Sequence, residues 1–510
     1  MSTITKKLFV MLSIGLFVTQ AHAADIYVSS SGANANDGTT LSTAFATINK
    51  AYDDAKNKPG DDVIIISGLI SLTGQITLID SSGSVSFVSA DDGYEGTQAV
   101  INNGGNNNRL FFTNASSVTA ISVFTGLEFE NISNSVGSGS FFGSNNSSSI
   151  TFNDCKFTNL SSSVIVPPVT DPVTAPNVDD NTNGIIQLSN TSMTFNTCVF
   201  DSNSTLNGNG GVFSVLSGGT LILNDCLFTG NSASQANKGK ANGGAISVVG
   251  TGGVTISNTT FYNNSSELQG GALFIAKTAS TCTLTNVTMF GNGCSTVSGA
   301  ARGGALRSES WTRLLVENSL FYGNNVSTSG TPNSSDVGFG DVEDATGAAA
   351  SSATFTNTLI GKTVLGEDSA NFIETNSVLN ADLASSALSY DSLDGKVKYV
   401  AATSGDSPID FGSDANDVGA WDSELSLPPL STQSLNRLKN ISIYNLSNGN
   451  VQFTLEGSSN AKVFDLLGNC ISSFSINNSY ELEANSFLPG VYILNITIDG
   501  KKYVQKFIVQ

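Results

Sequence analysis

The strongest constraint on the fold is a unit that recurs along the middle of the chain. Its copies align on one apolar position, occupied by Phe129, Phe157, Phe200, Phe228, Phe261, Met289, Phe321 and, more weakly, Ile360. Several spacings are 28 residues and the others are longer. A glycine pair lies at a nearly constant distance before this position. Gly210, Gly243 and Gly303 each precede it by 18 residues, and Gly270 precedes it by 19. We call the aligned apolar position the landmark of the repeat. Because the landmark and the glycine pair recur together, they indicate one structural period that tolerates loop insertions.

Each unit contains short β-branched and aromatic alternations, such as the VTI and TTF segments between Gly253 and Phe261. They are too brief for helices and lie between Gly or Asn turns, which predicts about three short strands per unit. One such unit cannot bury its apolar face alone, whereas stacked units bury a continuous core. The sequence therefore predicts an all-β chain built around a right-handed, single-stranded parallel β-helix.

Two columns of asparagine accompany the repeat. The first lies three residues after the aligned position, at Asn203, Asn231, Asn264, Asn292 and Asn324. The second lies three before it, at Asn258, Asn286, Asn318 and Asn357, with Asp154, Thr197 and Asp225 in other copies. Asparagine tolerates the left-handed backbone of a sharp bend, and its amide can bond to the equivalent amide one coil away. The glycine pair predicts a third bend, where a side chain would clash.

The six cysteines form no CxxC pair, which does not favour a metal site. Three of them share the position two before the aligned residue, in a column of small residues made of Cys155, Cys198, Cys226, Thr259, Val287 and Ser319. Strand alternation places this column on the interior face. We interpret these cysteines as buried free thiols; stacked positions lie about 4.8 Å apart, so a disulfide stays open as an alternative.

The repeat resembles two groups of proteins. Its architecture is similar to pectate-lyase-like β-helices. The GGA[IL] signature at 243–246, 270–273 and 303–306, with FxxN at Phe200, Phe228, Phe261 and Phe321, resembles polymorphic outer-membrane adhesins. The resemblance covers roughly residues 120 to 365 and implies the fold, whereas function does not follow from fold.

The N-terminus carries Lys6 and Lys7, an apolar run from Leu8 to Val18, and Ala21-His22-Ala23. This is the pattern of a secretory signal peptide over residues 1–23, and neither it nor any later run is long enough to span a bilayer. Cleavage would remove the sole histidine, excluding histidine dyads and histidine metal ligands. The mature chain then has 20 basic and 42 acidic residues, a net charge of −22 that argues against a nucleic-acid partner.

The solenoid is predicted to span 24–422. Phe45, Ile48, Tyr52 and Ala55 share one face of a capping helix near 43–57, with Ser42 or Thr43 as N-cap, which would cover the open end. The segment 407–422 resembles the closing coil of such proteins. Its Asp410, Asp414 and Asp417 suit turn capping, with calcium as the alternative; we predict no metal site and no cofactor. Residues 423–437 read as a linker.

Residues 438–510 change character to alternating strands separated by turns, which predicts a small antiparallel β-sandwich. This segment resembles the type IX secretion sorting domain. The matching residues include Asp465, Gly468, Gly490, Tyr492 and Lys506, while the usual Asn-Pro at its start is missing. The resemblance implies export through the type IX outer-membrane translocon as a partner, and a place in the medium or on the cell surface of a Gram-negative bacterium.

The candidate ligand site is the segment from Ala301 to Arg313. Three of the five arginines lie there beside a glutamate and one of two tryptophans, giving Arg302, Arg307, Glu309, Trp311 and Arg313; Lys238 and Lys240 lie near an earlier glycine pair. Indole faces stack on sugars and guanidinium groups pair with uronate or sulfate, so a basic strip would suit an anionic glycan. The alternative is a solvated outer face with a tryptophan filling a loop.

Two functions remain open from the sequence. The first is a secreted or surface β-helix that acts as an adhesin or glycan-binding module, with glycans or a host surface as partner. The second is a polysaccharide lyase or glycoside hydrolase acting on an acidic glycan. An Arg or Lys base would suit a lyase, but neither clustered carboxylates for calcium nor a carboxylate pair for a glycosidase is evident from the spacing.

Overall fold

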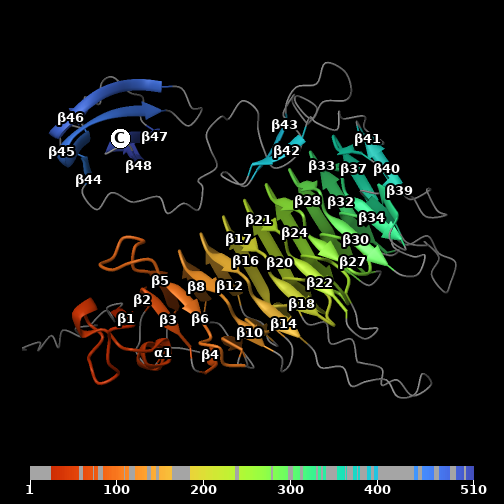
Figure 1. Cartoon of the computed structure of the whole chain (residues 1–510). Helices are drawn as coiled ribbons and strands as arrows, with labels where there is room; N and C mark the ends of the chain where they lie inside the picture. The colour runs from red at the N-terminus through yellow and green to blue at the C-terminus, as the bar shows by residue number, and fades with distance from the viewer. Residues whose placement is uncertain are drawn as a thin grey trace, which may run out of the picture.

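The computed structural model describes residues 24–379 and 388–399 with gaps, the longest at 164–183 and 340–352, and five strands between 441 and 509. Four long sheets run side by side through the repeat region, and in most coils the chain visits each of them once (Figure 1). This confirms the predicted all-β parallel β-helix. The predicted signal peptide, the linker and the segment 407–422 lie outside the described residues.

Sheet A contains the longest solenoid strands, and adjacent strands within it are all parallel. Its strands are β1 (Asp25–Ser29), β2 (Asp62–Ser67), β5 (Val85–Ser89), β8 (Ile121–Thr125), β12 (Ser149–Asn153), β16 (Ser192–Asn196), β20 (Thr220–Asn224), β24 (Gly253–Ser257), β28 (Cys282–Thr285), β32 (Leu314–Glu317), β37 (Ala353–Thr356) and β40 (Phe372–Thr375).

Sheet B follows sheet A in each coil and carries the aligned position of the repeat. Its strands are β3 (Leu69–Ser71), β6 (Val100–Asn102), β9 (Glu128–Glu130), β13 (Lys156–Thr158), β17 (Val199–Asp201), β21 (Leu227–Thr229), β25 (Thr260–Tyr262), β29 (Thr288–Phe290), β33 (Leu320–Tyr322), β38 (Leu359–Ile360) and β41 (Val378–Leu379). Register pairing links all eight predicted landmarks in one unbroken column from Phe129 to Ile360.

Sheet D comes next, in β10 (Ser133–Asn134), β14 (Ser161–Ser163), β18 (Ser204–Leu206), β22 (Ser232–Ser234), β26 (Ser265–Ser266), β30 (Gly293–Thr296), β34 (Asn325–Thr328) and the antiparallel β35 (Thr331–Ser334). Sheet C closes the coil, in β4 (Ile76–Leu78), β7 (Phe111–Thr113), β11 (Phe142–Ser144), β15 (Ile186–Leu188), β19 (Phe213–Val215), β23 (Ile246–Val248), β27 (Leu273–Ile275), β31 (Leu306–Ser308), β36 (Val337–Phe339) and β39 (Thr363–Val364). A pair, β42 (Leu388–Asp391) and β43 (Lys396–Tyr399), is antiparallel.

The expectation of about three strands per coil holds for the two coils from β2 to β7, but it was wrong for the coils from β8 to β31, which have four each. The extended segment that contains the aligned residue is interrupted just after it by a single residue with left-handed backbone, such as Ser202 with φ of 56° or Asn263 with φ of 55°. One left-handed residue turns the chain without a loop, so β17 and β18, or β25 and β26, become separate strands.

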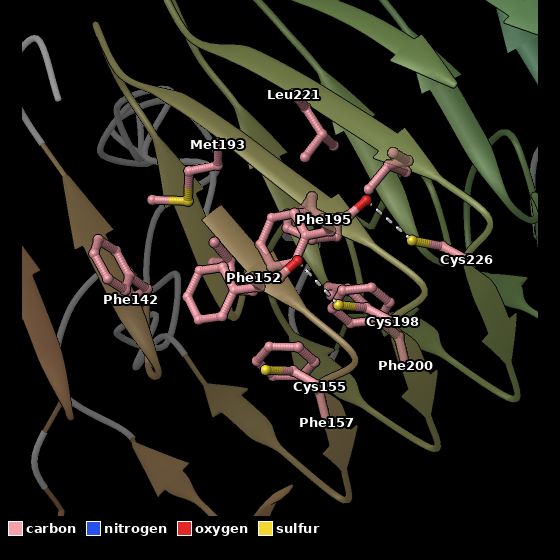
Figure 2. Packing of buried hydrophobic residues seen from close by; sticks show 14 of the residues in the cluster. Phe142, Phe152, Cys155, Phe157, Met193, Phe195, Cys198, Phe200, Leu221 and Cys226 are labelled. Atoms are coloured by element: carbon pink, nitrogen blue, oxygen red, sulfur yellow. Dashed lines mark hydrogen bonds between the residues drawn. The ribbon is translucent and has the colours of Figure 1, made fainter. Parts of the chain in front are cut away.

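The interior is filled by two stacks of phenylalanine. In sheet A, Phe87, Phe124, Phe152 and Phe195 follow one another with ring centroids 4.7, 4.6 and 4.7 Å apart. In sheet B, Phe200 lies 4.8 Å from Phe157 and 4.5 Å from Phe228. Figure 2 shows members of both stacks facing each other across the core. Parallel register places identical rings at coil spacing, which is why the landmark residue recurs.

The two asparagine columns differ in their main roles, although Asn286 in the second column also donates to Asn258 at 3.0 Å. The first is a buried ladder in which each side-chain amide donates to the next. Asn203 donates to Asn231 at 2.9 Å and Asn231 to Asn264 at 2.8 Å. Asn264 then donates to Asn292, and Asn292 to Asn324, both at 2.9 Å. The second supplies left-handed backbone, with φ between 47° and 55° at Asp154, Thr197, Asp225, Asn258, Asn286, Asn318 and Asn357. The ladder residues themselves are not among the left-handed positions of the described chain.

The glycine pair fits the predicted crowded bend. The first member is left-handed, with φ of 70° at Gly243. The second lies against backbone: a Cβ on Gly244 would be 2.0 Å from the carbonyl oxygen of Gly271 and 2.4 Å from that of Ser265. The bend therefore touches both the next coil and sheet D, and no side chain fits there.

The cysteine column is confirmed as buried and free, since Cys155, Cys198, Cys226, Cys282 and Cys294 all have free thiols. The thiols of Cys198 and Cys226 donate to carbonyl oxygens of sheet A, at 3.6 and 3.4 Å (Figure 2). Burial raises the pKa of Cys282 and of Cys294 to about 12. Such thiols are not nucleophiles at neutral pH.

A helix covers the N-terminal end of the solenoid, but it starts later than predicted. Helix α1 spans Ile48–Ala55, and its N-cap is Thr47, whose side chain accepts from the amide of Lys50. The predicted N-cap at Ser42 or Thr43 was wrong because a separate 3-10 turn, Leu41–Thr43, precedes it. Phe45 is buried, but it bridges Val28 in extended backbone. Tyr52 extends the phenylalanine stack, 6.1 Å from Phe87.

The C-terminal segment forms a separate antiparallel arrangement. Its strands are β44 (Ile441–Asn445), β45 (Val451–Phe464), β46 (Cys470–Leu482), β47 (Gly490–Ile498) and β48 (Lys501–Val509). Strand β45 pairs with β44, β46 and β47, so the described strands are joined in one hydrogen-bonded sheet. A register shift between Thr454 and Ser458 separates the part of β45 that pairs with β44 from the part that pairs with β47.

Candidate functional site: an outer aromatic row on sheet B

The arginine-rich segment is described only in part. Arg307 and Glu309 are described, whereas Arg302, Trp311 and Arg313 lie outside the described residues, as do Lys238 and Lys240. The structure therefore does not show whether the five predicted residues lie together. Their role in glycan binding stays a prediction.

Arg307 is buried, which the sequence did not indicate. It is the central residue of β31, paired with Phe274 of β27 and Gly338 of β36, and only 8% of it is exposed. Its Nε donates to Oε1 of Gln269 at 2.9 Å. Glu309, just after the strand, is half-buried, and its amide donates to the carbonyl of Ile275. Arg307 thus supports the packing of neighbouring coils and does not offer an open guanidinium to a polymer.

The outer face of sheet B carries a different constellation. Tyr262, Phe290 and Tyr322 each directly follow the interior landmark of their strand, so strand alternation points them outward. Register pairing places Tyr262 beside Phe290 and Phe290 beside Tyr322. All three are partly exposed. We call these three residues the outer aromatic row.

The row is held in place by its neighbours. The rings of Tyr262 and Phe290 are stacked, with centroids 5.8 Å apart and planes 19° apart. Each ring also lies against a glycine bend of the next coil: a Cβ on Gly291 would be 3.4 Å from Cε2 of Tyr262, and a Cβ on Gly323 would be 3.1 Å from Cε2 of Phe290. Glycine at these two bends leaves room for the rings, so Tyr262 and Phe290 are ordered before any ligand arrives.

Sequence reasoning missed this row although its signal is visible. The dipeptides Phe261-Tyr262, Met289-Phe290 and Phe321-Tyr322 recur at the landmark, while earlier coils have Glu130, Thr158, Asp201 or Thr229 after it. An outward-facing aromatic residue beside the landmark in three consecutive coils is more than the core requires. It therefore marks a surface feature.

The described residues contain neither a candidate metal cluster nor a candidate membrane-spanning helix. Within them, no group of three or more His, Cys, Asp or Glu residues is placed to hold a metal ion. Asp410, Asp414 and Asp417 lie outside them. No described helix is both long enough and apolar enough to cross a bilayer.

The predicted sorting residues fall partly on the C-terminal sheet. Gly490 and Tyr492 lie in β47 and Lys506 lies in β48, where Gly490 pairs with Val509 and Tyr492 with Phe507. Asp465 and Gly468 lie outside the described residues. Antiparallel pairing of β45, β47 and β48 thus gathers the segments that carry the resemblance.

Comparison with known families identifies this C-terminal region. Residues 442–510 match the secretion system C-terminal sorting domain. The chain is therefore a parallel β-helix with a type IX sorting domain, exported by type IX secretion and released or anchored at the cell surface. The search of curated proteins finds no match to this chain.

Proposed function

We propose that this exported β-helix is a glycan-binding surface protein of the adhesin type, and that the outer aromatic row is its contact site. The observation that supports the proposal is the register-aligned, partly exposed set of Tyr262, Phe290 and Tyr322 on consecutive coils. Aromatic rings pack against the apolar C–H faces of sugar rings, and tyrosine adds a hydroxyl for a polar contact.

Rigidity supports the same function. Rings already ordered by stacking and by Gly291 and Gly323 lose little conformational entropy when a ligand binds. A binding role also uses the solenoid as a stiff scaffold that displays one ring per coil.

The test compares binding by the full exported chain and by Phe290→Ala. We expect the substitution to weaken binding of glycan oligomers about tenfold, because the central ring and its stacking on Tyr262 are lost. Affinity would be measured by calorimetry or biolayer interferometry over a panel of glycans. Release of reducing ends or unsaturated products would be recorded in the same samples.

Leu315→Ala is the matched control, because Leu315 is an apolar residue that is 43% exposed on the outer face of sheet A. It should leave glycan affinity unchanged, and both variants should retain the parental melting temperature. Equal binding by the parent and Phe290→Ala would refute the contact site. Turnover of a glycan would refute the non-catalytic role and favour a lyase or hydrolase.

A further inference from the structure

Resting on the proposed function, we propose a narrower ligand class: the outer aromatic row selects an uncharged polysaccharide chain that extends along the solenoid axis. The sequence had pointed instead to an anionic glycan held by arginines. The charges that surround the row and the direction in which its rings are spaced both favour such a chain.

Two of the four register positions that precede the row in its column are acidic, and the other two are threonines. Following the register through sheet B, the outward position is occupied by Glu130, Thr158, Asp201 and Thr229 before it reaches Tyr262. Asp201 is two coils from Tyr262, a separation of about 10 Å at ordinary strand spacing. That is comparable to the Debye length at moderate ionic strength, so the carboxylate acts on a ligand at the row.

Positive charge is scarce beside this column. Among the described strands of sheet B, Lys156 is the sole basic residue, and its register neighbours are Glu128 and Val199. Of the two described arginines, Arg307 lies in strand β31 of sheet C and Arg109 lies just before strand β7 of the same sheet. Arg307 is buried there, and Arg109 donates to the carbonyl of Gly139 at 2.7 Å, with its guanidinium 4.9 Å from the ring centroid of Phe112.

Charge therefore works against polyuronates and sulfated glycans. The whole chain carries a net charge of −20, and Glu317 is exposed at the end of β32, in the same coil as Tyr322. A polyanion would bring one or more charges per sugar toward this face without a described guanidinium to pair with them. An uncharged chain keeps the stacking contacts and meets no repulsion.

The spacing sets the direction of the chain. The three rings lie one per coil, with Tyr262 and Phe290 centroids 5.8 Å apart, so the row runs parallel to the stacking direction of the coils. A chain lying along this row touches successive rings with successive sugars. An oligosaccharide should therefore bind more tightly than its monosaccharide, because the contacts add.

The experiment compares uncharged β-glucan oligosaccharides with polygalacturonate and dextran sulfate on the full exported chain, at low and at high salt. We expect the uncharged oligomer to bind at least tenfold more tightly than either polyanion at low salt, with little dependence on salt. Asp201→Asn should strengthen polyanion binding and leave the uncharged oligomer unchanged. Phe290→Ala should weaken binding of the uncharged oligomer.

The outcomes separate this inference from the proposed function. Tighter binding of a polyanion that weakens with salt, and that Phe290→Ala abolishes, would overturn the uncharged ligand class while the aromatic contact site stands. Binding of the uncharged oligomer that Phe290→Ala does not affect would overturn both. Absence of binding across the whole panel would also refute both.

Discussion

Asn264→Ala is expected to destabilise the solenoid by about 3 kcal/mol or more, because it leaves several buried partners unsatisfied. The Oδ1 of Asn264 accepts from the backbone and side-chain nitrogens of Asn231, at 3.0 and 2.8 Å. Its Nδ2 donates to the carbonyl of Phe228 at 3.1 Å and to Asn292 at 2.9 Å. The free energy of unfolding would be measured by chemical denaturation followed by circular dichroism.

Asn263→Gly provides the matched control one residue away. Asn263 is exposed and left-handed with φ of 55°, a conformation that glycine adopts without strain, so its replacement should change stability little. If Asn264→Ala were as stable as Asn263→Gly, the asparagine ladder would not hold the coils together and our account of the repeat would fail.

Gly244→Ala is the second substitution with a large expected effect, also about 3 kcal/mol or more. The added methyl group would lie 2.0 Å from the carbonyl oxygen of Gly271 and 2.4 Å from that of Ser265. Both contacts are with backbone, so relief requires the coil itself to shift against its neighbours. The measurement is the same denaturation series, together with the yield of folded protein.

Gly74→Ala distinguishes this clash from a general effect of replacing glycine. A Cβ at Gly74 meets no heavy atom within 4 Å, and its φ is outside the left-handed region, so alanine should be tolerated there. A Gly244→Ala protein with the stability of Gly74→Ala would show that the coils are not packed as tightly at this bend as the structure places them.

The stacking of coils could be predicted because the spacing of the repeated residues in the sequence indicates it. A phenylalanine and a glycine pair that stay in step along the chain specify which residues become neighbours, and the observed register links those same positions. The burial of the cysteine column followed from strand alternation in the same way.

The roles of the asparagines, the number of strands per coil and the start of the helix were harder to predict from the sequence. Which asparagine column forms the buried ladder and which adopts left-handed backbone could not be predicted, because both columns recur with the same period. The four-strand coil was missed because a single left-handed Ser202 or Asn263 interrupts a strand without any loop. The helix was placed too early because Phe45 has helical spacing from Ile48 but is buried through a bridge to Val28.

The outer aromatic row was not predicted because charge is easier to recognise in a sequence than exposure. Clustered arginines suggested an open basic strip, yet Arg307 lies buried against Gln269. The aromatic row lies directly beside the landmark, where phenylalanine already has a structural role, so its outward members were not considered. Distinguishing them requires knowing that Tyr262 follows Phe261 on the opposite face of the strand.

The most direct test of the account is oxidative footprinting of the full exported chain with and without a bound uncharged β-glucan oligosaccharide. Labelling at each aromatic residue would be quantified by mass spectrometry. We predict that the glycan protects Tyr262, Phe290 and Tyr322 and leaves the labelling of Tyr27 and Tyr94, near the other end of the solenoid, unchanged. Unchanged labelling of the outer aromatic row in the glycan-bound protein would contradict the account.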